Sequence, residues 1–131
     1  MLKEARSLSK EGKHDESFRA YASLFSSAAF QAAKPDDQRA VIKMMTHAKL
    51  PESVMTSESS KASHRAALPA LQALIMAGRE PADYEMLGMA YVILDEPAKA
   101  TEIFKKALEI ERSRSPGSDL CGDLMRRVSQ L

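Results

Sequence analysis

The stretch from Pro81 to Arg112 constrains the fold more than any other, because two apolar stripes with helical spacing flank a short polar turn. The first stripe has the spacing aromatic-x2-Leu-Gly-x2-Tyr, which places its members on one helical face. Its members are Tyr84, Leu87, Gly88 and Tyr91. The second stripe follows at Ala-x3-Phe and consists of Ala100, Ile103, Phe104, Ala107 and Leu108. The pattern predicts two helices that pack along these stripes.

Small residues in both stripes favour a close approach of the two helices. Gly88 has no side chain to hold a second helix away. Ala100 and Ala107 leave room for the aromatic rings opposite. Between the stripes, Asp95 tolerates a left-handed backbone and Pro97 suits a first helical turn. The sequence therefore predicts helices over 81–94 and from 97 onward.

In residue types and spacing, 81–114 resembles the tetratricopeptide repeat (TPR), a helix-turn-helix of about 34 residues. Arg112 stands where the family pattern often has proline, so we expect the second helix to continue beyond it. The resemblance implies an all-α array of antiparallel helix pairs, about seven helices in a right-handed superhelical solenoid. It also implies that the first helix of each pair lines a concave, peptide-binding groove.

The rest of the chain keeps weaker traces of the same repeat, so we expect one TPR-like domain over 1–131. Residues 1–34 are similar to a TPR unit in which Gly12 ends a short first helix and Tyr21 is the large aromatic residue. Residues 35–80 form a second unit with an insertion near 49–62. Pro69 interrupts its helical pattern, so we expect a bend or a late start there.

The C-terminal stretch, 115–131, is expected to be a capping helix that begins after Ser118. Cys121, Gly122 and Met125 follow Leu87, Gly88 and Tyr91 at the repeat period of about 34 residues. A lone helix can cover the last apolar face of a repeat array.

Charge and cysteine content exclude several classes of function. Nineteen basic and eighteen acidic residues give a net charge of +1, which offers no drive towards nucleic acid or anionic membrane. No apolar run is long enough to span a bilayer, and the first residues resemble no signal peptide. The single cysteine, Cys121, excludes an internal disulfide. We therefore expect a cytoplasmic protein without membrane insertion or nucleic-acid binding.

The chain carries no recognisable set of catalytic or metal-ligating residues. His14, His47 and His64 have no second histidine or cysteine at metal-ligand spacing, and nothing orients the neighbouring Ser63 and His64. Phosphate-binding glycine loops and metalloprotease motifs are missing from the sequence. We expect a non-enzymatic protein that uses no cofactor and no metal.

The helix predicted over 81–94 has a second apolar face beside its repeat stripe. This face consists of Ala82, Met86, Met89 and Ile93. The TPR resemblance implies that Met86, Met89 and Ile93 line the groove, and methionine suits an adaptable apolar surface. The alternative is that neighbouring helices, the 49–62 insertion or another subunit cover this face. The matching face of the first helix carries Lys3, Arg6 and Lys10.

Two functions fit this pattern. The first is a protein–protein interaction module that binds an amphipathic helix or an apolar peptide of a partner. The second is a self-associating scaffold or assembly adaptor whose apolar stripe is a homo-oligomer interface. A carboxylate clamp of the co-chaperone TPR kind is disfavoured, because the chain has no asparagine and Met89 occupies a groove position. A basic RNA-binding repeat is disfavoured by the near-neutral charge.

Overall fold

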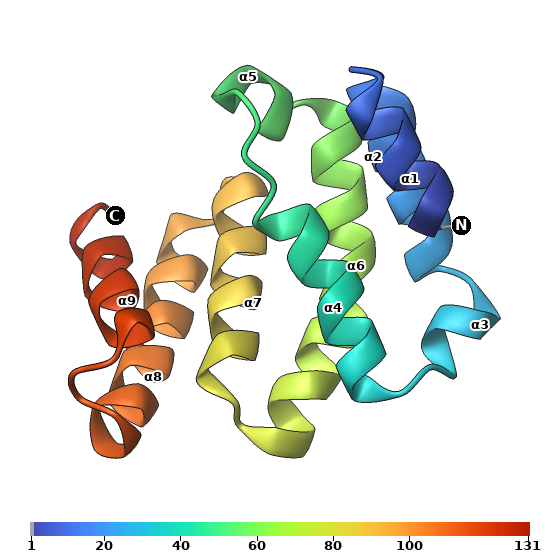
Figure 1. The fold of residues 1–131 in the computed structure, drawn as a ribbon. Helices are drawn as coiled ribbons and strands as arrows, with labels where there is room; N and C mark the ends of the chain where they lie inside the picture. Colours follow the sequence, from blue (N-terminus) through green and yellow to red (C-terminus); the bar gives the residue numbers. More distant parts are fainter. Residues whose placement is uncertain (1) are drawn as a thin grey trace. The chain divides into compact units, whose positions relative to one another are not determined.

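The computed structural model describes residues 2–131, which form nine α-helices and, within this range, no strand (Figure 1). The helices are α1 (Leu2–Lys10), α2 (His14–Phe25), α3 (Ala28–Gln31), α4 (Pro35–Thr46), α5 (Glu52–Met55), α6 (Glu58–Gly78), α7 (Pro81–Ile93), α8 (Pro97–Arg114) and α9 (Asp119–Ser129). The all-α prediction is confirmed, with nine helices in the described residues where about seven were expected. The two additional helices, α3 and α5, have four residues each. None of the helices in 2–131 combines the length and apolarity needed to cross a membrane.

The chain divides into two compact units, Met1–Ala70 and Leu71–Leu131, with the boundary inside α6. Each unit has buried apolar residues of its own. The predicted single domain and its TPR-like solenoid stay predictions.

In the first unit, α1 ends as its sequence predicts. Gly12 has a φ of 78°, the left-handed region that suits glycine. Its amide donates to the Ser9 carbonyl at 3.1 Å, and the Lys13 amide donates to the Leu8 carbonyl at 2.9 Å. These paired bonds satisfy carbonyls that the end of a helix leaves free. The turn lets α2 pack back against α1.

Packing in the first unit centres on the apolar face of α2. Phe18, Tyr21 and Phe25 are buried there. The Ser17 hydroxyl, also buried, donates to the Ala5 carbonyl of α1 at 2.7 Å. Phe25 meets Phe30 of α3 edge-on, with 5.1 Å between ring centroids. The short helix α3 therefore extends the core of the first helix pair.

The expected insertion at 49–62 is partly helical. It contains α5 and the first turn of α6, whose N-terminal Ser60 amide donates to the Ser57 hydroxyl at 3.3 Å. The expected late start near Pro69 is wrong, since α6 begins at Glu58 and continues through the proline to Gly78. A proline removes one backbone hydrogen bond from a helix. Here the packing of Ala67 and Leu71, which are buried on either side of Pro69, stabilises the helix against that loss.

The second unit is built on the pair α7–α8, and its turn also follows the prediction. Asp95 has a φ of 59°. Its amide donates to the Val92 carbonyl at 3.2 Å, and the Glu96 amide donates to the Tyr91 carbonyl at 2.9 Å. Pro97 is the first residue of α8. The turn has the same bonding pattern as the end of α1, with aspartate in place of glycine.

The contact between α7 and α8 depends on the absence of a side chain at Gly88. A Cβ atom built there would lie 2.4 Å from Cε1 of Phe104. Phe104 is 1% exposed, and Ala100 and Ala107 beside it are fully buried. The prediction that the helices meet closely at Gly88 is therefore confirmed. So is the continuation of α8 beyond Arg112, to Arg114.

The last helix, α9, packs on α8 and completes this core. The Ser118 hydroxyl caps it by accepting from the Cys121 amide at 3.0 Å, as expected. Cys121 and Leu124 are buried in one cluster with Phe104. Arg127 donates to the Glu85 carboxylate of α7 at 3.1 Å, and its guanidinium lies 5.8 Å from the Phe104 ring centroid. Both apolar and charged contacts therefore hold α9 in place.

Candidate functional site

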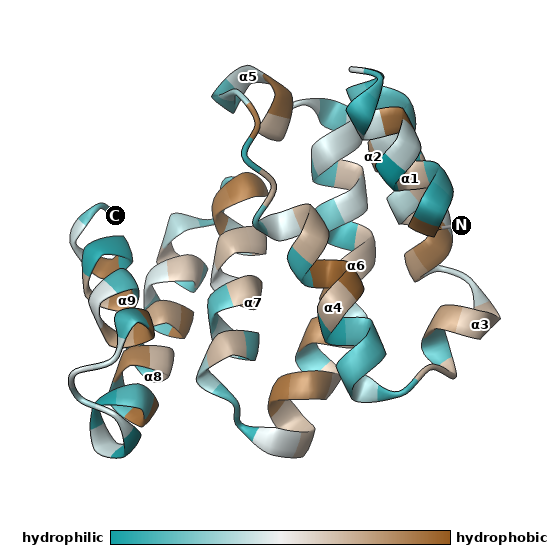
Figure 2. Cartoon of the chain, in the orientation of Figure 1, coloured by the Kyte–Doolittle hydropathy of each residue, from teal (hydrophilic) through white to brown (hydrophobic). Residues whose placement is uncertain are grey.

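The second apolar face of α7 is more covered than the sequence suggests. Met86 is 2% exposed, and Met89 is half-buried against the cluster that contains Tyr84 and Phe104. Met89 therefore contacts the core of the second unit and is not a purely surface residue. A helix that is apolar on most sides is covered on most sides, and in Figure 2 α7 is pale to brown over most of its length. Ala82, at the start of the helix, is exposed.

An accessible apolar surface remains at the C-terminal end of α7. Val92 is 42% exposed, and Met89 and Ile93 are partly exposed beside it. Their spacing of three and four residues places them on neighbouring turns of one face. We call Met89, Val92 and Ile93 the α7 patch. The sequence interpretation missed Val92, although its spacing of three from Met89 marks it as a neighbour.

The predicted basic residues lie on one exposed face of α1. Lys3, Arg6 and Lys10, with Ser7, line a shallow hollow of about 320 Å³. This face belongs to the first unit and the α7 patch to the second, and each is a candidate surface in its own right.

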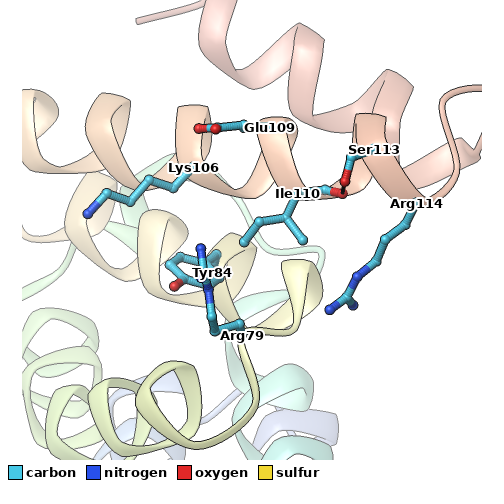
Figure 3. A pocket seen from close by; sticks show the side chains of 7 residues that line it. All are labelled: Arg79, Tyr84, Lys106, Glu109, Ile110, Ser113 and Arg114. Atoms are coloured by element: carbon cyan, nitrogen blue, oxygen red, sulfur yellow. Dashed lines mark hydrogen bonds between the residues drawn. The ribbon is translucent and has the colours of Figure 1, made fainter.

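The second unit also has a hollow that the sequence did not reveal, with a volume of about 530 Å³. We call it the α8 hollow, and its lining residues are Arg79, Tyr84, Lys106, Glu109, Ile110, Ser113 and Arg114. Figure 3 shows Lys106 and Arg114 extending from opposite ends of the hollow, with Ile110 between them. Their i, i+4, i+8 spacing on α8 gives the order cation, apolar residue, cation, which is the one signal that the sequence offers.

The cations of the α8 hollow form only weak, solvent-exposed ion pairs or none. Arg114 lies 3.2 Å from the Glu80 carboxylate, and Lys106 lies 3.8 Å from that of Glu102. Both pairs are exposed, and exposed pairs contribute little to stability. Arg79 belongs to none of the ion pairs that residues 2–131 form. It also has a φ of 52°, a left-handed conformation that is uncommon for a residue with a side chain.

His64 of α6 and its neighbours Ser60 and Ser63 are buried in the first unit. His64 is fully buried, and its Nδ1 lies 2.8 Å from the Ser60 carbonyl oxygen, while its Nε2 has no partner. The Ser63 hydroxyl donates to the same carbonyl and not to the histidine. Phe18 of α2 lies against the ring, with centroids 6.3 Å apart. Within residues 2–131, no three acidic, histidine or cysteine side chains gather in a way that could hold a metal ion.

Burial of His64 predicts a loss of stability in mild acid. Burial lowers the pKa of His64 below its usual 6.5, so the native state favours the neutral ring. The neutral His64 ring makes its full contribution to the free energy of unfolding above the unfolded-state pKa. This contribution is lost as the pH falls from there through the native-state pKa. Below about pH 6.5, we expect the free energy of unfolding to fall by up to about 1.4 kcal/mol per pH unit more steeply than in His64→Leu. Urea unfolding of both proteins between about pH 7.5 and about pH 5 checks this, and parallel curves would contradict it.

Comparison with protein-family models, curated proteins and solved structures found no match to this chain.

Proposed function

We propose that this chain is a non-enzymatic, cytoplasmic protein–protein interaction module of TPR-like type, which binds a peptide or amphipathic helix of a partner protein without a cofactor. The observation that carries the proposal is the α7 patch, where Val92 is 42% exposed between half-buried Met89 and Ile93. Side chains at i, i+3 and i+4 are the arrangement with which one helix meets another in a groove.

The chemistry of the α7 patch suits a partner that varies in shape. Met89 supplies a flexible thioether chain that adapts to different apolar surfaces. The core of the second unit supports the α7 patch, because Met89 packs on the cluster that contains Phe104. A ligand would therefore meet a surface whose position is fixed by the core of the second unit, which reduces the ordering cost of binding.

Val92→Glu tests the proposal. We expect peptides selected from a random library on the wild-type protein to bind this variant at least about tenfold more weakly, because the new carboxylate would be desolvated against an apolar ligand. The melting temperature should stay close to that of the wild type, since Val92 is exposed. Met125→Glu is the matched control, because Met125 is 48% exposed on α9 and receives the same charge. Equal affinity of both variants for the selected peptides would contradict the proposal.

The alternative function is a self-associating scaffold, in which the α7 patch meets the same patch of a second copy. An exposed apolar surface favours it, because a two-fold interface needs only one self-complementary patch. Light scattering separates the two functions. The scaffold predicts an oligomer that Val92→Glu converts to a monomer, whereas the interaction module predicts a monomer in both cases.

A further inference from the structure

We propose that the α8 hollow binds an acidic stretch of the partner, namely an extended segment with an apolar residue between two carboxylates. This inference rests on the proposed function, and it names the chemistry that the partner would present. The hollow combines an apolar centre, formed by Ile110 and Tyr84, with cations around it.

The spacing of the cations favours an extended peptide. Lys106, Ile110 and Arg114 are separated by four residues each, which is about 6 Å per step along α8. In an extended peptide, every second side chain points to the same side, at steps of about 6.6 Å. A Glu-x-Leu-x-Glu segment would therefore place its carboxylates near Lys106 and Arg114 and its leucine near Ile110. A single phosphate ion is too small to engage both ends.

Arg79 provides the third cation, at the end of α6. Arg79 has a φ of 52° and comes directly after Gly78 in the sequence. The left-handed conformation is therefore taken by the arginine and not by the glycine, which would adopt it without strain. The Arg79 amide donates to the Ile75 carbonyl at 3.2 Å, so this left-handed residue ends α6, and the helix end fixes where the Arg79 side chain begins. In Figure 3 Arg79 and Tyr84 appear on the side of the hollow opposite Glu109.

The existing ion pairs leave room for a ligand. Glu80 and Glu102 hold Arg114 and Lys106 only through exposed pairs, so a ligand carboxylate can share or replace them. Glu109 is the one acidic residue in the lining, and it opposes an acidic ligand. Its removal should strengthen binding, whereas removal of a lining cation should weaken it.

Fluorescence anisotropy with two labelled peptides tests the proposal. One peptide is Ser-Glu-Ser-Leu-Ser-Glu-Ser, and the other has glutamine in place of both glutamates. We expect the glutamate peptide to bind the wild type about fivefold or more tightly than the glutamine peptide at low salt, and the difference to shrink as salt is added. Glu109→Gln should increase the affinity for the glutamate peptide.

Arg79→Gly separates binding from folding. Glycine removes the cation and also relieves the left-handed backbone, so affinity for the glutamate peptide should fall about fivefold without a lower melting temperature. Arg112→Ser is the control, because it removes an exposed cation of α8 that does not line the hollow. This control should bind within about twofold of the wild type.

Three results would overturn the proposal. They are equal affinity for the two peptides, equal losses in Arg79→Gly and Arg112→Ser, and displacement of the peptide by an equal concentration of inorganic phosphate. The test is independent of the α7 patch. If the selected library peptides need Val92 for binding but carry no paired acidic residues, this inference is contradicted and the proposed function stands. If glutamate-peptide binding depends on Arg79 while Val92→Glu has no effect on library peptides, the proposed function fails and the α8 hollow stands.

Discussion

Gly88→Leu is expected to destabilise the second unit by roughly 1–3 kcal/mol or more, because the new side chain overpacks the contact between α7 and α8. Even a Cβ atom at Gly88 would lie 2.4, 2.6 and 2.8 Å from three atoms of the Phe104 ring. The ring is 1% exposed and has little room to move. Thermal and urea unfolding measure the loss.

Gly122 offers a matched control for Gly88. It lies inside α9, and a Cβ atom built there meets nothing within 4 Å. Gly122→Ala should therefore stabilise the protein by up to about 1 kcal/mol, because alanine has the higher helix propensity. Gly88→Ala gains the same propensity but meets Phe104, so it should destabilise. Similar stabilisation by both alanine variants would show that the close contact at Gly88 is not present.

Deletion of Ser118–Leu131 is expected to have the largest effect on the second unit. It removes Leu124 and Cys121, which are 0% and 2% exposed in the cluster around Phe104. Loss of one buried leucine side chain alone costs about 2–5 kcal/mol. Glu85, which is 6% exposed, also loses its contact with Arg127. We expect a lower melting temperature and aggregation of the exposed apolar surface, measured by circular dichroism and light scattering.

A shorter deletion is the control for this experiment. Removal of Gln130 and Leu131 leaves α9 complete, because the helix ends at Ser129. This variant should melt close to the wild type. If the protein that lacks Ser118–Leu131 stays monomeric and equally stable, α9 is a detachable tail and not part of the core.

The sequence predicted those parts of the fold that depend on local chemistry. Gly12 and Asp95 mark helix ends because few residues adopt a left-handed backbone, and Ser118 marks a start because its hydroxyl caps free amides. The contact of Gly88 with Phe104 was predictable because glycine and the aromatic residue stand in facing stripes. The helices α3 and α5 were missed, since four residues are too few to show a helical period.

The candidate surfaces were less predictable, because exposure depends on which elements cover a helix. Met86 and Val92 have similar apolar side chains on α7, yet Met86 is 2% and Val92 42% exposed. Spacing alone does not distinguish them. Arg79 and Arg114 line the same hollow although they are 35 positions apart in the chain, and it is the packing of α7 on α8 that brings them to one surface.

The most direct test of the interaction-module proposal is an amide NMR titration of the wild-type protein with a library-selected peptide. The proposal predicts saturable shift changes that are largest at Met89, Val92 and Ile93 and that disappear in Val92→Glu. The proposal is contradicted if no amide resonance of α7 shifts when peptide is added. It is also contradicted if the same resonances shift with protein concentration in the absence of peptide.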